Sequence, residues 1–154
     1  MKPILQVEDE ENDVLFFEMA ARKAEIRNPL RLAQNATEAI DYLKGAGRFV
    51  DREQFPLPCL LILDLNMPGA SGFEVLKFIR ANDELRCLVV VVFTSSDREE
   101  DVETAYRLGA NSYIVKPANP GELLHIVNTI NEYWLGVNRF PDRDSMVDRP
   151  AKAA

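Results

Sequence analysis

The chain has 154 residues, and its 18 basic against 25 acidic side chains give a formal charge of −7. A chain of this length can bury about 70% of the surface that it exposes when unfolded, so a single domain can hold a core without disulfides or a structural metal. The acidic balance, with no run of Lys or Arg longer than two residues, argues against direct binding of nucleic acid.

The cysteines and the apolar runs indicate where the protein resides. Cys59 and Cys87 are far apart and lack the CxxC or CxxH spacing of a metal site, which is typical of small buried side chains in a reducing compartment. The longest apolar runs are too short to span a bilayer, and the first residues lack the pattern of a signal peptide. The sequence therefore predicts a cytoplasmic protein with no membrane partner.

Hydrophobic periodicity predicts strands that alternate with helices along the chain. Short apolar runs predict strands at residues 4–7, 30–33, 59–63, 88–93 and 112–115. Apolar residues at three- and four-residue spacing predict helices at 13–26, 37–43, 73–80 and 122–134. A further helix is expected after Asp97, which would cap it, and runs to Gly109. Residues 48–58, with two prolines and mixed charge, form a longer connecting loop.

This alternation predicts the fold class. Right-handed crossovers convert five strand-helix pairs into an α/β, doubly wound, five-stranded parallel sheet with helices on both faces. The third and fourth strands are uninterrupted apolar runs, as strands covered on both faces require. We assign this domain to residues 1–135. Residues 136–154 turn to Asn, Arg, Pro and Asp and are predicted to form a C-terminal tail without an output domain.

Polar side chains follow four of the predicted strands where each strand ends. Ligands of open parallel sheets bind at this carboxyl edge. The polar residues after the first, third, fourth and fifth strands are Glu8 with Asp9, Asp64, Thr94 and Lys116. Their agreement in position predicts one shared site.

The residue types at this edge suit phosphoryl chemistry. Three converging carboxylates repel one another, and a hard cation such as Mg²⁺ relieves that repulsion. Glu8, Asp9 and Asp64, with a carbonyl from the following turn, match the oxygen ligands of Mg²⁺. The Thr94 hydroxyl and the Lys116 ammonium could neutralise phosphoryl oxygens, and an ionised Asp beside the metal can accept the group as a nucleophile.

At this point the sequence resembles the receiver domain of two-component response regulators over about residues 3–134. The paired acids appear as VED, the phosphoacceptor motif as LILDLNMPGASG, the hydroxyl position as VVFTSS and the lysine motif as YIVKP. The resemblance implies a flavodoxin-like fold with strand order 2-1-3-4-5. It also implies that Asp64 is phosphorylated by a histidine kinase, with Mg²⁺ bound directly by Asp9, through water by Glu8, and by the backbone carbonyl of Asn66.

The resemblance assigns roles to the other motif residues as well. Thr94 and Lys116 would contact the phosphoryl group, and Tyr113 would rotate when Thr94 is drawn inward. Lys116-Pro117 would be a cis peptide. Glu8 stands where many members have Asp, which keeps the charge and lengthens the arm.

A second resemblance rests on the long loop after the second helix and on the aromatic segment 134–141. Both are similar to the stand-alone regulators of bacterial phytochrome kinases, which implies a phytochrome as the histidine kinase. Without an output domain the signal would leave through contacts with an unknown downstream protein. We predict a homodimer that uses the aromatic segment and the surface of the fourth helix, fifth strand and fifth helix.

Simpler interpretations exist for each residue alone. Asp64 could cap a turn, and Tyr113 alone is more often a half-buried core aromatic. The only histidine, His125, is expected to be a partly exposed helix residue. Their order at successive strand ends favours the joint interpretation.

Two other functions compete with a phosphorylated signalling module. A phosphatase of the haloacid dehalogenase type also forms an aspartyl-phosphate, but it needs a second Asp two residues on, where this chain has Asn66. An amide cannot donate and recover the proton of the leaving group, so we expect no enzymatic turnover of other substrates. The other alternative is an interaction protein of receiver fold that works without phosphorylation, against which the complete set of site residues argues.

Overall fold

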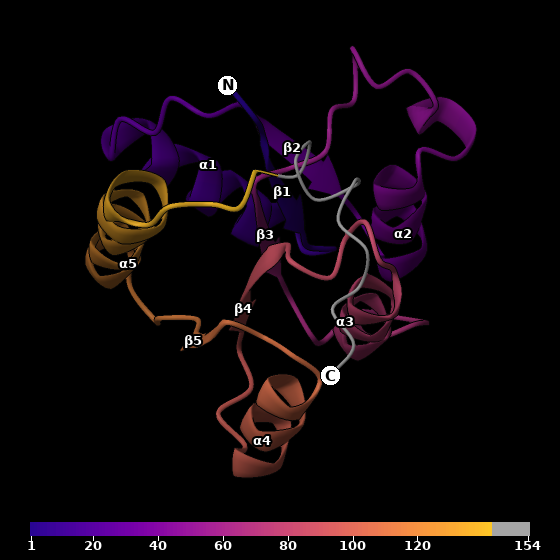
Figure 1. Ribbon diagram of the computed structural model, residues 1–154. Helices are drawn as coiled ribbons and strands as arrows, with labels where there is room; N and C mark the ends of the chain where they lie inside the picture. The colour runs from indigo at the N-terminus through magenta and orange to yellow at the C-terminus, as the bar shows by residue number, and fades with distance from the viewer. Residues whose placement is uncertain (143–154) are drawn as a thin grey trace.

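The computed structural model describes residues 1–142 as a five-stranded sheet flanked by helices (Figure 1). The strands are β1 (Ile4–Val7), β2 (Leu30–Ala33), β3 (Leu60–Leu63), β4 (Val89–Thr94) and β5 (Ser112–Val115). The α-helices are α1 (Glu11–Lys23), α2 (Ala36–Lys44), α3 (Gly72–Ala81), α4 (Glu99–Arg107) and α5 (Pro120–Glu132). All neighbouring strands are parallel in the order β2-β1-β3-β4-β5, which confirms the predicted flavodoxin-like fold.

Strand positions agree closely with the hydrophobic pattern, whereas helix ends differ from it by a few residues. α1 begins at Glu11, two residues before the predicted start, and its first turn is acidic, as the positive end of a helix favours. α5 begins at Pro120, whose fixed φ suits a first helical turn. The side chain of Asn119 caps α5 by accepting a 2.9 Å hydrogen bond from the backbone of Glu122.

The predicted cap of the fourth helix, Asp97, is wrong. Arg98 occupies the N-cap position of α4 without a side-chain cap bond. The hydroxyl of Ser96 instead accepts a 3.4 Å bond from the backbone N–H of Arg98 and donates a 2.5 Å bond to Asp101 Oδ2. Ser96 therefore holds the start of α4, because its short side chain can bond in both directions within the turn.

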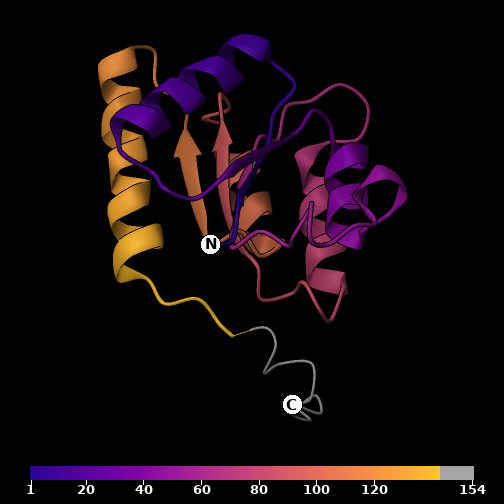
Figure 2. The ribbon, with the colours of Figure 1, turned by 90° about the horizontal axis from the view of Figure 1, so that it is seen from above.

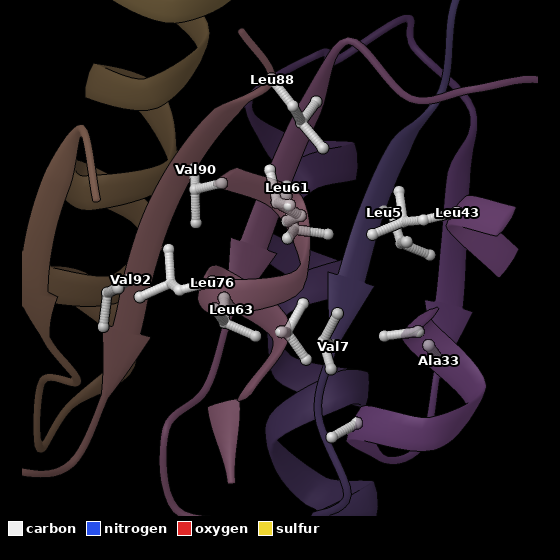
Figure 3. Packing of buried hydrophobic residues seen from close by; sticks show 14 of the residues in the cluster. Leu5, Val7, Ala33, Leu43, Leu61, Leu63, Leu76, Leu88, Val90 and Val92 are labelled. Carbon is white, nitrogen blue, oxygen red and sulfur yellow. The ribbon is translucent and has the colours of Figure 1, made fainter. Parts of the chain in front are cut away.

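The sheet is covered on both faces, and side-chain alternation sorts its buried residues into two clusters. α1 and α5 cover one face, while α2 and α3 cover the other (Figure 2), where Ala105 of α4 also packs. The cluster beneath α2 and α3 includes, from the sheet, Leu5, Val7, Leu61, Leu63, Val90 and Val92 (Figure 3). The opposite cluster includes Ile4, Leu60, Ile62, Val89, Val91 and Phe93. At the carboxyl edge of the sheet, Glu8, Asp64 and Lys116 directly follow β1, β3 and β5, and Thr94 ends β4.

Helix packing on the face covered by α1 and α5 depends on completely buried side chains. Phe17 of α1 and Val127 of α5 both have about 1% exposure or less. Burying a side chain of this kind contributes about 1.5–3 kcal/mol relative to leaving it in water. The amide of Asn131 adds a 2.8 Å hydrogen bond to the carbonyl of Ala24 and so joins the ends of α5 and α1, which lie side by side in Figures 1 and 2.

The long connection between α2 and β3 is ordered by its own contacts and contains a short 3-10 helix, η1 (Gly47–Phe49). Arg52 donates to the carbonyls of Tyr42 at 2.7 Å and Leu43 at 2.8 Å, which belong to the last turn of α2. The ring of Tyr42 lies 6.0 Å from that of Phe55, and its hydroxyl donates to a backbone carbonyl of the same loop. The loop is therefore part of the folded core.

Beyond α5 the chain continues as a π-helix, η2 (Tyr133–Val137). Trp134, Leu135 and Phe140 pack against the cluster beneath α1 and α5. Most of the predicted tail, at residues 143–154, lies outside the described residues. No helix in residues 1–142 is both long enough and apolar enough to cross a membrane.

Candidate phosphoacceptor site

Backbone hydrogen bonds continue past the strands and fix the first polar residue after each one. The N–H of Glu8 donates to Ala33 O at 3.0 Å, and the N–H of Asp64 donates to Val7 O at 3.0 Å. The N–H of Lys116 donates to Thr94 O at 2.7 Å. The sheet itself thus places these three predicted site residues, and Lys116 bonds to both Glu8 and Asp64 at this edge.

Three acids form a compact cluster of oxygen ligands. Carboxylate oxygens of Glu8, Asp9 and Asp64 lie within 4.8 Å of one another. Glu8 and Asp64 are buried, with 2% and 4% exposure, whereas Asp9 is exposed. All three donors are hard anionic oxygens, and the exposed side leaves room for water, so the residues fit the preferences of Mg²⁺.

Lys116 lies at the centre of the site. Its Nζ is 2.6 Å from Glu8 Oε2, 2.8 Å from Asp13 Oδ2 and 3.3 Å from Asp64 Oδ2. The ammonium partly neutralises these acids, which explains how two buried carboxylates coexist.

Asp13 is a site residue that the sequence analysis missed, because it belongs to α1 and does not follow a strand. The available signal was an acid in the first turn of the helix that follows the paired acids. Position alone did not distinguish Asp13 from its acidic neighbours in that turn.

Burial and charge shift the proton affinities at this site. Burial raises the pKa of Glu8 to about 7, because the loss of hydration outweighs the hydrogen bond from Lys116. The nearby charge of Asp64 acts in the same direction. Burial alone would lower the pKa of Lys116, but hydrogen bonds to Asp13 and Glu8 raise it above its usual value. Lys116 therefore stays positively charged.

Asn66 links Asp64 to Thr94. The backbone N–H of Asn66 donates to Asp64 Oδ1 at 3.2 Å, and its side-chain amide donates to Thr94 Oγ1 at 3.4 Å. Thr94 is fully buried at the end of β4. The predicted hydroxyl position is thus linked to the turn that carries the proposed phosphoacceptor.

Tyr113 is half-buried on β5 and pairs with Val92 of β4 in the sheet. Its hydroxyl donates a 2.8 Å hydrogen bond to the backbone carbonyl of Ser96. Burial raises the pKa of the Tyr113 phenol above its usual value, although the hydrogen bond to Ser96 opposes this. The predicted switch residue therefore contacts the loop between β4 and α4.

The expected cis peptide between Lys116 and Pro117 is not present, since residues 1–142 contain no cis peptide bond. The trans form is intrinsically favoured for Xaa-Pro by about 0.5–1 kcal/mol. His125, which was expected to be a partly exposed helix residue, is exposed on α5.

Fold and site together define a doubly wound α/β protein of the receiver type, with an acidic cluster, a hydroxyl and a lysine at one carboxyl edge of the sheet. The chain belongs to the response regulator receiver domain family, whose model matches residues 4–128.

Known relatives are similar over nearly the whole chain. The probable methanogenesis regulatory protein FilR2 of Methanothrix harundinacea is 36% identical, over 90% of this chain and 86% of FilR2. Response regulator Rcp1 of Synechocystis is 34% identical, over 91% of this chain and 93% of Rcp1. The solved Mn²⁺-bound form of Rcp1 superposes with a TM-score of 0.83, covering 92% of this chain and 100% of Rcp1.

A second solved relative is the phosphorylated cyanobacterial phytochrome response regulator RcpA. It is 33% identical, with a TM-score of 0.85, over 92% of this chain and 99% of RcpA. The chain is thus similar to a phytochrome response regulator as well as to a probable methanogenesis regulatory protein.

Proposed function

We propose that this receiver domain accepts a phosphoryl group from a histidine kinase on Asp64, in a Mg²⁺-dependent reaction, and passes the signal on through protein contacts. This proposal is based on the contacts of the Asp64 side chain. Its buried carboxylate lies within 4.8 Å of two further acids and accepts bonds from Asn66 and Lys116. Transfer of phosphoryl groups from histidine kinases is the general role of the family.

Each residue of the site can take a separate role in phosphoryl transfer. A carboxylate oxygen of Asp64 attacks phosphorus, and the bond from phosphorus to the donor nitrogen breaks, leaving its electron pair on the imidazole. Lys116 and Thr94 hold the phosphoryl oxygens as charge moves onto them. When bound by Glu8, Asp9, Asp64 and the backbone carbonyl of Asn66, Mg²⁺ supplies further neutralisation of that charge.

The test is phosphorylation by a small phosphodonor such as acetyl phosphate in the presence of Mg²⁺, followed by mass spectrometry. We expect one added phosphoryl group in the wild-type chain and none in Asp64→Asn. The matched control is Asp83→Asn, which changes an Asp with a 93% exposed side chain outside the site. Equal labelling of Asp64→Asn would show that another residue accepts the group.

The kinase partner is proposed from the relatives. Similarity to RcpA and Rcp1, together with the folded α2–β3 connection and the η2 segment, supports a phytochrome as the phosphoryl donor. Phosphotransfer profiling against the histidine kinases of the source organism tests this. Faster transfer from a phytochrome kinase is expected, and preference for a kinase without a phytochrome module would contradict it.

We also propose that the chain forms a homodimer through the β5 and α5 surface. A groove of about 410 Å³ lies there, with Ile114, Ile126 and Trp134 in its lining. Tyr133 of η2 also lines this groove and is 50% exposed, and Val137 at the end of η2 is 79% exposed. A second copy would cover these apolar side chains. Phosphorylation would change this surface, and an unknown downstream protein would bind according to that change.

Light scattering on the full chain tests the dimer. A wild-type mass of two chains is expected, and Val137→Asp should shift it toward one chain. Val50→Asp, which changes another exposed valine at 72% on the α2–β3 connection, is the control and should leave the mass unchanged. A wild-type monomer at all concentrations would contradict the proposal.

Turnover of phosphate esters is less well supported. The side chain of Asn66 is already bonded to Thr94 and carries no acidic proton for a leaving group. The proposed function is therefore that of a phosphoacceptor, limited to its own phosphorylation and slow dephosphorylation.

A further inference from the structure

The ammonium of Lys116 bonds to three carboxylates, and one of them lies outside the acidic cluster. The three acceptors are Glu8 at 2.6 Å, Asp13 at 2.8 Å and Asp64 at 3.3 Å. An ammonium has three N–H donors, so these bonds use all of them. A phosphoryl group on Asp64 can therefore reach Lys116 only if one carboxylate gives up its bond.

Asp13 differs from the other two acceptors. The cluster whose oxygens lie within 4.8 Å of one another consists of Glu8, Asp9 and Asp64 among the residues that the structure describes. A cation held by this cluster takes up the charge of its acids and repels the Lys116 ammonium. Asp13, whose side chain is 38% exposed at the start of α1, is outside this cluster and remains available to bond to Lys116.

We propose that Asp13 is a positioning residue of the phosphorylation site, which keeps the Lys116 ammonium bound when a metal takes over Glu8 and Asp64 and later competes with the phosphoryl group for that ammonium. This inference rests on the proposed function, because it assigns a role in the same reaction. It predicts two effects of opposite sign when the charge of Asp13 is removed.

The first effect concerns the metal. Without Asp13, Lys116 bonds more closely to Glu8 and Asp64, so Mg²⁺ must displace a stronger competitor. The second effect concerns the phosphoryl group, which loses the carboxylate that competes with it for Lys116. General damage to the site would instead weaken both kinds of binding.

The experiment uses the full chain and the variant Asp13→Asn. Calorimetry measures the dissociation constant of Mg²⁺ and, at saturating Mg²⁺, that of beryllium trifluoride, an analogue of the phosphoryl group. We expect the first constant to rise and the second to fall, each by about twofold to fivefold, the effect of a partly exposed ion pair. Asp13→Glu should return both toward wild type, because it restores the charge.

The matched control is Glu11→Gln, which removes one charge from the same turn of α1. It should change both constants less than Asp13→Asn does. Equal shifts in the two variants would show a general field effect and overturn the proposal. Unchanged constants in Asp13→Asn, or weaker binding of both ligands, would overturn it too.

A third measurement needs neither ligand. Nitrogen-15 NMR of the metal-free chain reports the hydrogen exchange of the Lys116 ammonium, which should be faster in Asp13→Asn than in wild type or Glu11→Gln. Equal exchange rates would overturn the role of Asp13. A wild-type chain that binds Mg²⁺ but not beryllium trifluoride would overturn the proposed function, while the Mg²⁺ and exchange measurements would still decide the role of Asp13.

Discussion

The hydroxyl of Tyr113 donates a 2.8 Å hydrogen bond to the backbone carbonyl of Ser96, which joins the edge strand β5 to the loop between β4 and α4. The side chain of Ser96 is bonded in turn to Asp101 in the first turn of α4. This loop begins directly after Thr94, the proposed phosphoryl contact. A movement of Thr94 would therefore displace this loop and change its hydrogen bond to Tyr113.

The first prediction follows from that bond. Tyr113→Phe keeps the ring and leaves the carbonyl of Ser96 without its donor, so the free energy of unfolding should fall by about 1 kcal/mol. Urea denaturation measures it. The control is Tyr106→Phe on α4, where the ring is half exposed and the change should stay within about 0.5 kcal/mol. Equal losses in both variants would contradict the role of the Ser96 bond.

The second prediction concerns pH. Glu8 has a pKa of about 7 in the folded chain, above its ordinary value of 4.5, so its ionisation destabilises the metal-free fold. The stabilising contribution of protonated Glu8 is fully present below about pH 4.5 and is lost as the pH rises through about 7. Mg²⁺ requires the ionised form and must release this proton.

The affinity for Mg²⁺ should therefore rise with pH up to about 7 and fall by up to about tenfold per pH unit below it. Calorimetry between pH 5.5 and pH 8 measures the affinity, and buffers of different ionisation enthalpy report the released proton. An affinity that is constant across this range, with no proton release, would contradict the prediction.

The third prediction concerns Gly72, the first residue of α3. A Cβ at this position would lie well inside van der Waals contact with the carbonyl oxygen of Asp64 and 2.9 Å from Leu65 Cα. Because backbone atoms cannot move aside as a side chain does, Gly72→Ala should cost about 1–3 kcal/mol of stability and displace the phosphoacceptor turn. Thermal unfolding and the rate of labelling by acetyl phosphate measure the two effects.

Gly121→Ala is the matched control for Gly72→Ala. A Cβ there meets only the side chain of Asn119, at an ordinary 3.5 Å, within the first turn of α5. Alanine is favoured over glycine in a helix, so stability should stay constant or rise by about 0.5–1 kcal/mol. If Gly72→Ala were as stable as Gly121→Ala and were labelled by acetyl phosphate at the same rate, the close approach of Gly72 to the Asp64 carbonyl would be refuted.

The fourth prediction concerns Arg80 on α3, whose guanidinium joins three segments. It donates to the carbonyls of Gly109 at 2.6 Å, Arg86 at 2.8 Å and Leu88 at 2.8 Å. Arg80→Met keeps the apolar stem but leaves these acceptors without a charged donor, which should cost about 2–3 kcal/mol in urea unfolding. The exposed Arg22→Met on α1 should cost less than about 0.5 kcal/mol, and a similar loss in both would contradict the prediction.

Local pattern predicted the strands better than the helix ends. β1, β2 and β5 occupy the expected residues, because an apolar run flanked by polar residues marks a strand directly. Helix ends depend on caps, where several polar side chains compete. Asp97 was the expected cap of α4, but Ser96 makes the bonds at its start, a choice that depends on where the backbone turns after β4.

The site was predictable to the extent that the sheet places it. Parallel strands bring their carboxyl ends to one edge, so Glu8, Asp64, Thr94 and Lys116 could be grouped from their positions after strands. Asp13 follows no strand and lies 103 residues from Lys116 in the chain. Its contact depends on how α1 packs on the sheet, which no local pattern describes.

The sequence by itself thus determined the α/β fold class, the acidic character of one sheet edge and the chemistry that this edge suits, because strand periodicity and residue type are local properties. Only the tertiary structure decided which carboxylates share Lys116, which carbonyl receives the Tyr113 hydroxyl and how closely Gly72 approaches Asp64. These relationships depend on distances between segments far apart in the chain, and such distances are set when the helices pack against the sheet.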